Sequence, residues 1–358
     1  MNFVYNSFAG AYSDSPRAIF EALRDDPAHR HVWLSSERHL AAFPPGVETV
    51  PYDTPEAVAA LEAADVVIAN THTDFEWSKR PDTLYLQTWH GTPLKRVHKD
   101  ILWSPPGLHD RQQLDVDRWD VLLSPNRAST ARLRQAFRYD REVLETGYPR
   151  NDVLSAPDRE ARRAALRERL GIADGATAVL YTPTFRDDSV FAERRFELGL
   201  DADAFAAALG SDHVLLLRLH YLVPEELPPT RHPAVRDVSS HPDVSELYLA
   251  ADVLVTDYSS TMFDFAVTGR PLAFLTYDLA DFQHRVRGFY FELADEAPGP
   301  LVETTAELIG VLRDLDATSA RYVERYARFS ERYCHLEDGH ATERVLERLG
   351  VRPEAPVG

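Results

Sequence analysis

The chain has 358 residues, of which 44% are hydrophobic and 27% are charged, a composition typical of a globular protein with room for two domains. Its net charge of −18 and pI near 5.2 argue against a nucleic-acid surface, which needs a basic stripe, and against general electrostatic attraction to anionic lipid. One cysteine, Cys334, rules out an internal disulfide, and neither a signal peptide nor a bilayer-length apolar run is present, so we expect a cytoplasmic location.

The first half of the chain alternates strand and helix signals. Ser13-Asp14-Ser15-Pro16 predicts a helix start, because proline suits the first helical turn. Two further helices are expected to begin at Thr54 and Ser129. Short apolar runs predict strands over 3–5, 31–34, 65–69, 83–88, 120–124 and 143–145.

The strand over 83–88 runs into a turn at His90 and Gly91, and Thr92-Pro93 predicts a helix start. His90 would then lie at the C-terminal edge of a parallel strand, the edge that lines the ligand crevice in open α/β sheets. The adjacent glycine lets a ligand approach the backbone. His90 is therefore a candidate general base, and the alternative is a histidine that only hydrogen-bonds a loop carbonyl.

The second half repeats the alternation after a charged connector helix over 158–170. Strands are expected over 177–182, 213–219, 235–239, 253–256 and 272–275, and helices over 201–209, 244–249 and 261–267, before a helical tail broken at Gly339. The pattern predicts an α/β protein of two doubly wound domains that face a central cleft. We place the domains at 1–155 and 156–358, with the helical tail in the second.

Groups suited to phosphate binding follow several of these strands. Ser259 and Ser260 precede the helix expected at 261, where free N–H groups and the helix dipole favour an anion, and ordinary N-capping is the alternative. Arg150, Thr184 and Arg218 could face the same cleft, although an exposed loop arginine is the commoner case.

Recognised nucleotide and metal signatures are missing from the sequence. It contains neither a GxxxxGK[ST] loop nor a GxGxxG fingerprint, and no close His/Cys/Asp/Glu cluster suggests zinc. Asp257 and Asp264 could share a magnesium ion, but helix capping and hydrogen bonding across the cleft are favoured for them. We therefore expect neither a metal nor a cofactor.

Six motifs occur in a fixed order along nearly the whole chain. They are QTWHGTPLK (87–95), GYPRND (147–152), YTPTFRD (181–187), RLH (218–220), SELYLAADVLVTDYSSTMFDF (245–265) and RGFYFE (287–292). Together they resemble the CDP-glycerol glycerophosphotransferase family, whose enzymes prime or polymerise teichoic acid and related poly(glycerol phosphate) chains. The resemblance implies a GT-B fold, with two Rossmann-like domains and the active site between them.

The resemblance also implies which residues form the site. His90 and His220 match two histidines regarded as essential in the family, and CDP-glycerol is expected mainly on the second domain. Family members commonly have a proline directly after or near the second histidine, whereas Tyr221-Leu222-Val223-Pro224 follows His220 here. The matching substrate-binding positions are Gly91, Thr92, Pro93, Leu94, Arg150, Pro183, Thr184, Arg218, Leu219, Ser259, Ser260 and Asp264.

The implied reaction is transfer of glycerol phosphate from CDP-glycerol to an acceptor hydroxyl, with CMP leaving. The acceptor would be a polyol phosphate chain, a capsule glycan or a lipid-linked glycan. A lipid-linked acceptor would require peripheral contact with the inner membrane face, to which Trp103 and Leu108 could contribute, although core packing is the favoured role for Trp103. The alternatives are a CDP-ribitol or other CDP-polyol donor, a GT-B glycosyltransferase using a sugar nucleotide, and a non-catalytic nucleotide-binding module.

Overall fold

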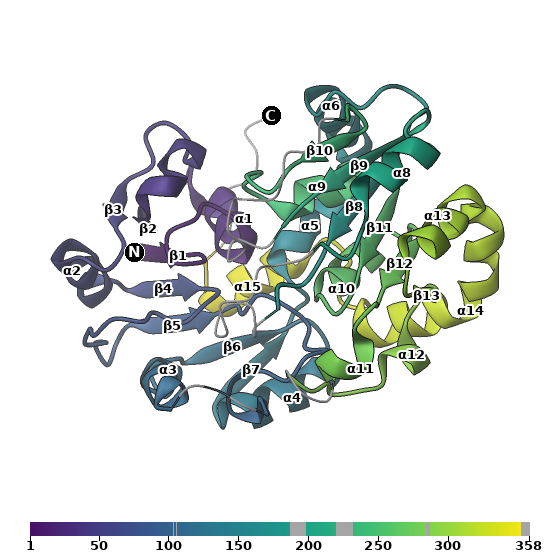
Figure 1. The fold of residues 1–358 in the computed structure, drawn as a ribbon. Coiled ribbons are helices and arrows are strands. Elements are labelled where there is room, and N and C mark those ends of the chain that lie inside the picture. The colour runs from purple at the N-terminus through teal and green to yellow at the C-terminus, as the bar shows by residue number, and fades with distance from the viewer. Residues whose placement is uncertain (103, 105, 187–197, 220–231, 284–286, 352–358) are drawn as a thin grey trace.

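The structure is a computed structural model that describes residues 1–102, 104, 106–186, 198–219, 232–283 and 287–351. Two parallel sheets form its frame, the first in the purple-to-blue half of Figure 1 and the second in the teal-to-green half. The first sheet contains β1 (Asn2–Asn6), β2 (Arg30–Ser35), β3 (Thr49–Pro51), β4 (Val66–Ala69), β5 (Leu84–Gln87), β6 (Val121–Ser124) and β7 (Glu142–Glu145). The second contains β8 (Thr177–Thr182), β9 (His213–Leu217), β10 (Val235–Asp237), β11 (Val253–Thr256), β12 (Leu272–Leu275) and β13 (Leu301–Val302).

Both sheets reverse their strand order beside their first strand. The orders are β3-β2-β1-β4-β5-β6-β7 and β10-β9-β8-β11-β12-β13, with every pairing parallel. The switch points therefore lie between β1 and β4 and between β8 and β11, and ligands bind at such points in open α/β sheets. The predicted pair of doubly wound sheets is confirmed.

Helices cover the sheets, which is why the central strands are nearly continuous apolar runs. Several helices begin at the residue that the sequence favours: the Thr54 side chain accepts a hydrogen bond from Ala57 N, and the Asp201 side chain accepts one from Ala204 N. The α-helices are α1 (Asp14–Leu23), α2 (Pro55–Ala63), α3 (Leu108–Val116), α4 (Arg127–Phe137), α5 (Asp152–Ser155), α6 (Arg159–Arg169), α8 (Ala202–Leu209), α9 (Val244–Ala250), α10 (Thr261–Ala266), α11 (Leu279–Asp281), α12 (Leu293–Glu296), α13 (Thr305–Arg313), α14 (Leu315–Tyr333) and α15 (Ala341–Leu349). Short 3-10 turns are η1 (Glu37–Ala42), η2 (His98–Asp100) and η3 (Pro149–Asn151).

The helix expected to begin at Thr92 does not form, and that prediction was wrong. The segment instead crosses to the second half of the chain: Tyr290 N donates to Leu94 O at 2.8 Å, and Arg96 N donates to Gly288 O at 3.0 Å. Backbone N–H and C=O groups that would pair within a helix instead form hydrogen bonds between the two halves. Tertiary hydrogen bonding has therefore outweighed the local preference for a helix.

The helical tail returns to the first sheet. Phe329 and Tyr333 of α14 pack in the core of the second half, whereas Val345 and Leu346 of α15 pack in a cluster with Phe3 and other residues of the first sheet. Figure 1 shows α15, in yellow, beside that sheet. The predicted boundary at 155/156 stays a prediction, but the last helix packs with the first half rather than the second. Among the described residues, no helix combines the length and the apolar character needed to cross a bilayer.

The loop between α14 and α15 holds a half-buried glutamate, Glu337. Tyr148 N donates to Glu337 Oε1 at 3.1 Å and to Oε2 at 3.2 Å. Burial is the largest effect on this group and the Asp264 charge adds to it, so that the pKa of Glu337 rises from 4.5 to about 8.

This pKa predicts a pH dependence of stability. Between about pH 4.5 and 8 the folded protein keeps a proton on Glu337 that the unfolded chain releases, so the free energy of unfolding should fall as pH rises. Glu337→Gln keeps an oxygen acceptor for Tyr148 N and removes this titration. The Tm of the variant minus that of the natural chain should therefore increase from about pH 5 to about pH 8 in calorimetry. A difference that stays constant with pH would contradict the assignment.

Candidate active site

His90 follows β5, and its ring is fixed by residues from three segments. Its Nδ1 lies 2.6 Å from the carbonyl oxygen of Asn70, the residue after β4. Its ring centroid is 4.2 Å from that of Trp89 and 5.4 Å from that of Phe8. Since a carbonyl oxygen only accepts, Nδ1 carries the proton and Nε2 is the basic nitrogen. The carbonyl contact considered as an alternative to catalysis is therefore present, and it is the contact that sets a base-competent tautomer.

Desolvation by the surrounding groups dominates the titration of His90. It lowers the pKa from 6.5 to about 4, with Arg150 and His72 contributing in the same direction. The Asn70 carbonyl and the Asp14 carboxylate oppose the shift. At neutral pH the imidazole is therefore unprotonated and able to accept a proton. A bound pyrophosphate would bring negative charge near the ring and favour its protonated form during the reaction.

The loop that carries His90 touches the start of α10. A Cβ placed on Gly91 would lie 2.6 Å from Ser260 Oγ and 2.9 Å from Ser260 Cβ. The structure thus brings together two of the predicted site segments, one from each half. Ser259 Oγ accepts a hydrogen bond from Thr261 N at 3.3 Å, whereas the Ser260 side chain makes no capping bond. The Ser259 side chain therefore caps the start of the helix, whereas the Ser260 hydroxyl makes no capping bond and can bind another partner.

Gly91→Ala tests this close approach. The added methyl group would force the His90 loop and α10 apart by several tenths of an ångström, and misplacement of this size at a reacting centre can lower turnover about 10- to 100-fold. Steady-state kinetics would measure the loss. Ser260→Gly removes both atoms that the added methyl group would meet. Gly91→Ala should therefore lower turnover less in the Ser260→Gly background than in the natural chain. Equal losses in the two backgrounds would show that the contact does not matter.

Arg150 is buried between two carboxylates rather than facing a phosphate. Its Nη1 donates to Asp14 Oδ2 at 3.0 Å, and its Nη2 donates to both carboxylate oxygens of Asp264 at 3.0 Å. Only 2% of its side chain is exposed. Asn151 Nδ2 also donates to Asp264 at 3.0 Å. Arg150 and Asp264 therefore pair with each other and join α1 to α10, and the predicted contact of each with the substrate stays a prediction.

Arg218 has the opposite environment. Its Nη1 donates to the carbonyl oxygens of Val238 at 3.3 Å and His241 at 2.6 Å, and burial lowers its pKa. In the described part of the chain its hydrogen-bond partners are these two backbone carbonyls, and the Asp243 carboxylate acts on it only through its charge. Its positive charge is therefore left to meet an anionic ligand. The neighbouring Leu219 N donates to Ser239 Oγ at 2.9 Å, and this bond holds the segment after β9 in place.

The loop after β8 is organised by Asp257. Thr184 N donates to its two carboxylate oxygens at 2.9 and 3.1 Å, and Arg186 Nη1 donates at 3.0 Å. Thr184 Oγ1 is buried with no partner among the described residues, which fits a hydroxyl kept for a ligand, and Pro183 precedes it. Both carboxylates considered for magnesium, Asp257 and Asp264, are paired with arginines instead.

The remaining predicted positions are less accessible or undescribed. Thr92, Pro93 and Leu94 are buried, Pro93 O accepts from Arg132 Nη1 at 3.0 Å, and Leu94 belongs to the apolar core of the second half. The side chain of Leu94 packs in this core, and its predicted place in the substrate site stays a prediction. His220 and Trp103 lie outside the described residues.

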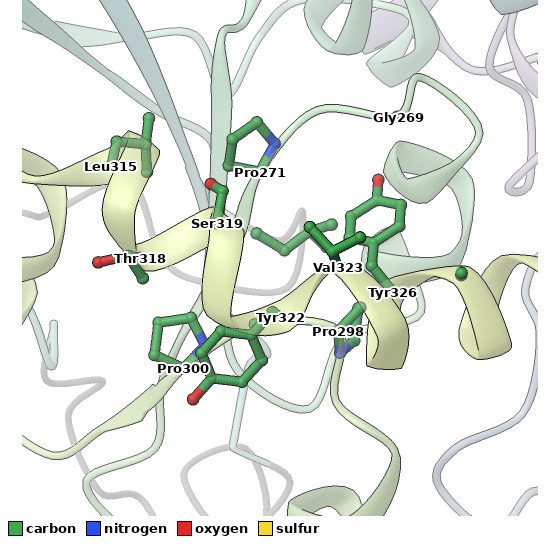
Figure 2. A pocket seen from close by; sticks show the side chains of 13 residues that line it. Gly269, Pro271, Pro298, Pro300, Leu315, Thr318, Ser319, Tyr322, Val323 and Tyr326 are labelled. Carbon is green, nitrogen blue, oxygen red and sulfur yellow. The ribbon is translucent and has the colours of Figure 1, made fainter.

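A separate hollow of about 270 Å³ lies away from these groups (Figure 2). Three prolines from the loops beside β12 and β13 line it, facing tyrosines and a valine of α14: Pro271, Pro298, Pro300, Tyr322, Val323 and Tyr326. None of the predicted site residues that the structure describes lines it, and its described lining holds no cationic side chain for a phosphate. The candidate active site is therefore the junction of the His90 loop, α10 and the ends of β8 and β9.

Comparison with known proteins agrees with this geometry. Residues 2–350 match the family model described as CDP-Glycerol:Poly(glycerophosphate) glycerophosphotransferase. The chain is 39% identical to a teichoic acid glycerol-phosphate transferase of Staphylococcus aureus, covering 97% of this chain and 92% of the relative. It is 36% identical to a teichoic acid poly(glycerol phosphate) polymerase of Bacillus subtilis, of which it spans about half, 48%. A structure of the wall teichoic acid polymerase TagF soaked with CDPG matches with a TM-score of 0.89 and 35% identity, covering 98% of this chain and 88% of that one.

Proposed function

This chain belongs to the CDP-glycerol:poly(glycerophosphate) glycerophosphotransferase family, and we propose that it carries out the family's reaction with His90 as general base. The reaction is transfer of glycerol phosphate from CDP-glycerol in teichoic acid synthesis, and the acceptor is a poly(glycerophosphate) chain. The observation that carries the assignment of the base is the neutral imidazole of His90, with its Nδ1 proton held by Asn70 and its loop seated against Ser260.

The proposed chemistry is an in-line displacement at phosphorus. The acceptor hydroxyl oxygen attacks the phosphorus that bears glycerol, the bond from that phosphorus to the bridging oxygen breaks, and CMP leaves with the bonding electrons. Nε2 of His90 takes the hydroxyl proton. Arg218, Ser260 and Thr184 are assigned to the donor phosphates, because each keeps polar capacity that the described protein groups do not satisfy. His220, beyond the described residues, is assigned to the leaving phosphate from its sequence motif.

Arg150 receives a revised role in this proposal. It holds Asp14 and Asp264 together and thereby fixes the first turn of α1 relative to α10. Both elements flank the segments that would bind the donor. We therefore assign Arg150 a positioning role, and its predicted contact with a donor phosphate stays a prediction.

We further propose that the protein contacts the membrane when the acceptor is attached to a lipid. A poly(glycerophosphate) acceptor that is carried on a lipid-linked glycan would require peripheral contact with the inner membrane face. Two exposed leucines, Leu102 and Leu114, with 51% and 57% of their surface exposed, flank the segment that carries Leu108 and Trp103. We assign this segment to that contact. Flotation with vesicles that contain a lipid-linked disaccharide should detect binding, and Leu102→Ser with Leu114→Ser should weaken it.

The decisive test is CMP release from CDP-glycerol by the purified protein with a glycerol phosphate oligomer as acceptor, and with CDP-ribitol in parallel. Acceptor-dependent CMP release from CDP-glycerol alone is expected. Release only from CDP-ribitol would reassign the donor within the CDP-polyols, and release of UDP or GDP from a sugar nucleotide would indicate a glycosyltransferase. Tight CDP-glycerol binding without turnover, across several acceptors, would favour a binding module.

A further inference from the structure

Asn70 connects His90 to the end of β1 through all of its polar groups. The residue is completely buried. Its backbone N donates to Asn6 O at 3.2 Å, and its backbone O accepts from His90 Nδ1 at 2.6 Å. Its side-chain Oδ1 accepts from Phe8 N at 3.0 Å, and its Nδ2 donates to Ser7 Oγ at 3.1 Å. One side chain thus holds the chain after β1, while the same residue's carbonyl holds the imidazole.

The segment from Ser7 to Gly10 is a strained turn. Phe8 has φ 45° and Ala9 has φ 54°, a region that L-residues other than Asn and Asp adopt rarely. Gly10 N donates to Ser7 O at 3.0 Å, and Gly10 is packed so closely that an added Cβ would lie 2.3 Å from Ser36 N. A backbone in this conformation persists only where its surroundings hold it. The Asn70 side chain supplies two of those restraining contacts.

The turn places an aromatic ring against His90. The Phe8 ring meets the imidazole edge to face, with centroids 5.4 Å apart and planes at 62°. Trp89 also packs on this ring, and His90 is left only partly exposed. We propose that Asn70 is a positioning residue that holds the Ser7–Gly10 turn so that Phe8 shields His90 from water. The inference rests on the proposed role of His90, and it adds Asn70 and Phe8 as residues that act through His90.

Three charged or titratable groups from other elements influence His90: Asp14 at the start of α1, Arg150 in η3, and His72 after β4. The Asp14 carboxylate favours the imidazolium, whereas Arg150 and His72 disfavour it. Exclusion of water outweighs all three and lowers the pKa of His90. Withdrawal of the Phe8 ring would remove part of that exclusion without altering any of the three groups. The pKa of His90 should then move upward, toward 6.5.

The test uses Asn70→Ala and Phe8→Ala, with Phe8→Leu as the conservative variant. Phe43→Ala is the matched control, because Phe43 is also a partly buried aromatic beside the first sheet but packs on Tyr12 and Trp33 instead of His90. Phe8→Ala keeps the proposal testable if Asn70→Ala does not fold, since it leaves the backbone bonds of the turn intact. Each protein is assayed for kcat and KM with CDP-glycerol. The ring shifts of His90 are followed by NMR between about pH 5 and 7.5 in the absence of substrate.

The expected kcat is about 10- to 100-fold lower in Asn70→Ala and Phe8→Ala, with KM for CDP-glycerol changed less than about threefold. His90 should stay neutral over this pH range in the natural chain and in Phe43→Ala, should take up protons in both alanine variants, and should regain most of its neutrality in Phe8→Leu. An unchanged His90 titration in both alanine variants would overturn the inference. The NMR result does not depend on turnover, so a shifted titration in an enzyme that tolerates His90→Ala would uphold the shielding and reject only the role of His90 as base.

Discussion

His90→Ala is expected to lower kcat by about 10²- to 10⁴-fold, the usual contribution of a positioned general base. The acceptor hydroxyl would lose the only group assigned to take its proton, because the neighbouring Asp14 is already engaged by Arg150. CDP-glycerol binding should change little, since the groups assigned to the donor lie on the second half of the chain. Titration calorimetry with CDP-glycerol and steady-state CMP release would measure the two properties separately.

The matched control is His340→Ala, whose imidazole is 65% exposed and pairs with Glu343 on the surface at the start of α15. Its turnover should match that of the natural chain. Near-normal kcat in His90→Ala would remove His90 as the base. A loss of CDP-glycerol binding equal to the loss of turnover would instead make it a donor ligand.

Arg150→Ala is expected to cost about 3–5 kcal/mol of stability, because it leaves two buried carboxylates without their cation. Burial already raises the pKa of Asp264, and Arg150 is the strongest group that opposes this rise. Without the guanidinium, folding would require Asp264 to remain charged at a desolvated site or to take up a proton. Calorimetric Tm measurements near neutral pH should show a large decrease.

Two control experiments distinguish the loss of this buried ion pair from the general effect of removing an arginine. Arg30→Ala breaks a surface ion pair with Glu48 in which both side chains are about half exposed, so its cost should stay below about 1 kcal/mol. Asp14→Asn with Asp264→Asn in the Arg150→Ala background removes the uncompensated charges and should recover part of the lost Tm. Equal effects of Arg150→Ala and Arg30→Ala would contradict the buried ion-pair assignment.

Local patterns were sufficient for most elements of the fold. Apolar runs such as 253–256 and 177–182 became strands because a strand buried on both faces needs an uninterrupted apolar sequence, and nothing local competed with that. Capping residues such as Thr54 marked helix starts because their side chains satisfy N–H groups within the same turn. Where the pairing partner was distant, the same reasoning failed: the segment after His90 forms backbone bonds with residues near 289 instead of a helix.

The sequence by itself determined the two parallel sheets, their alternation with helices, the family, and the placement of His90 after a strand. These features follow from hydrophobic periodicity and from motifs whose residues are close together in the sequence. Only the tertiary structure decided what each polar group meets. It buried Arg150 between Asp14 and Asp264, brought Gly91 against Ser260, and placed Asn70 and Phe8 around His90. Such contacts join positions separated by tens to more than a hundred residues, and the desolvation and charge pairing that set their chemistry arise only when the chain has folded.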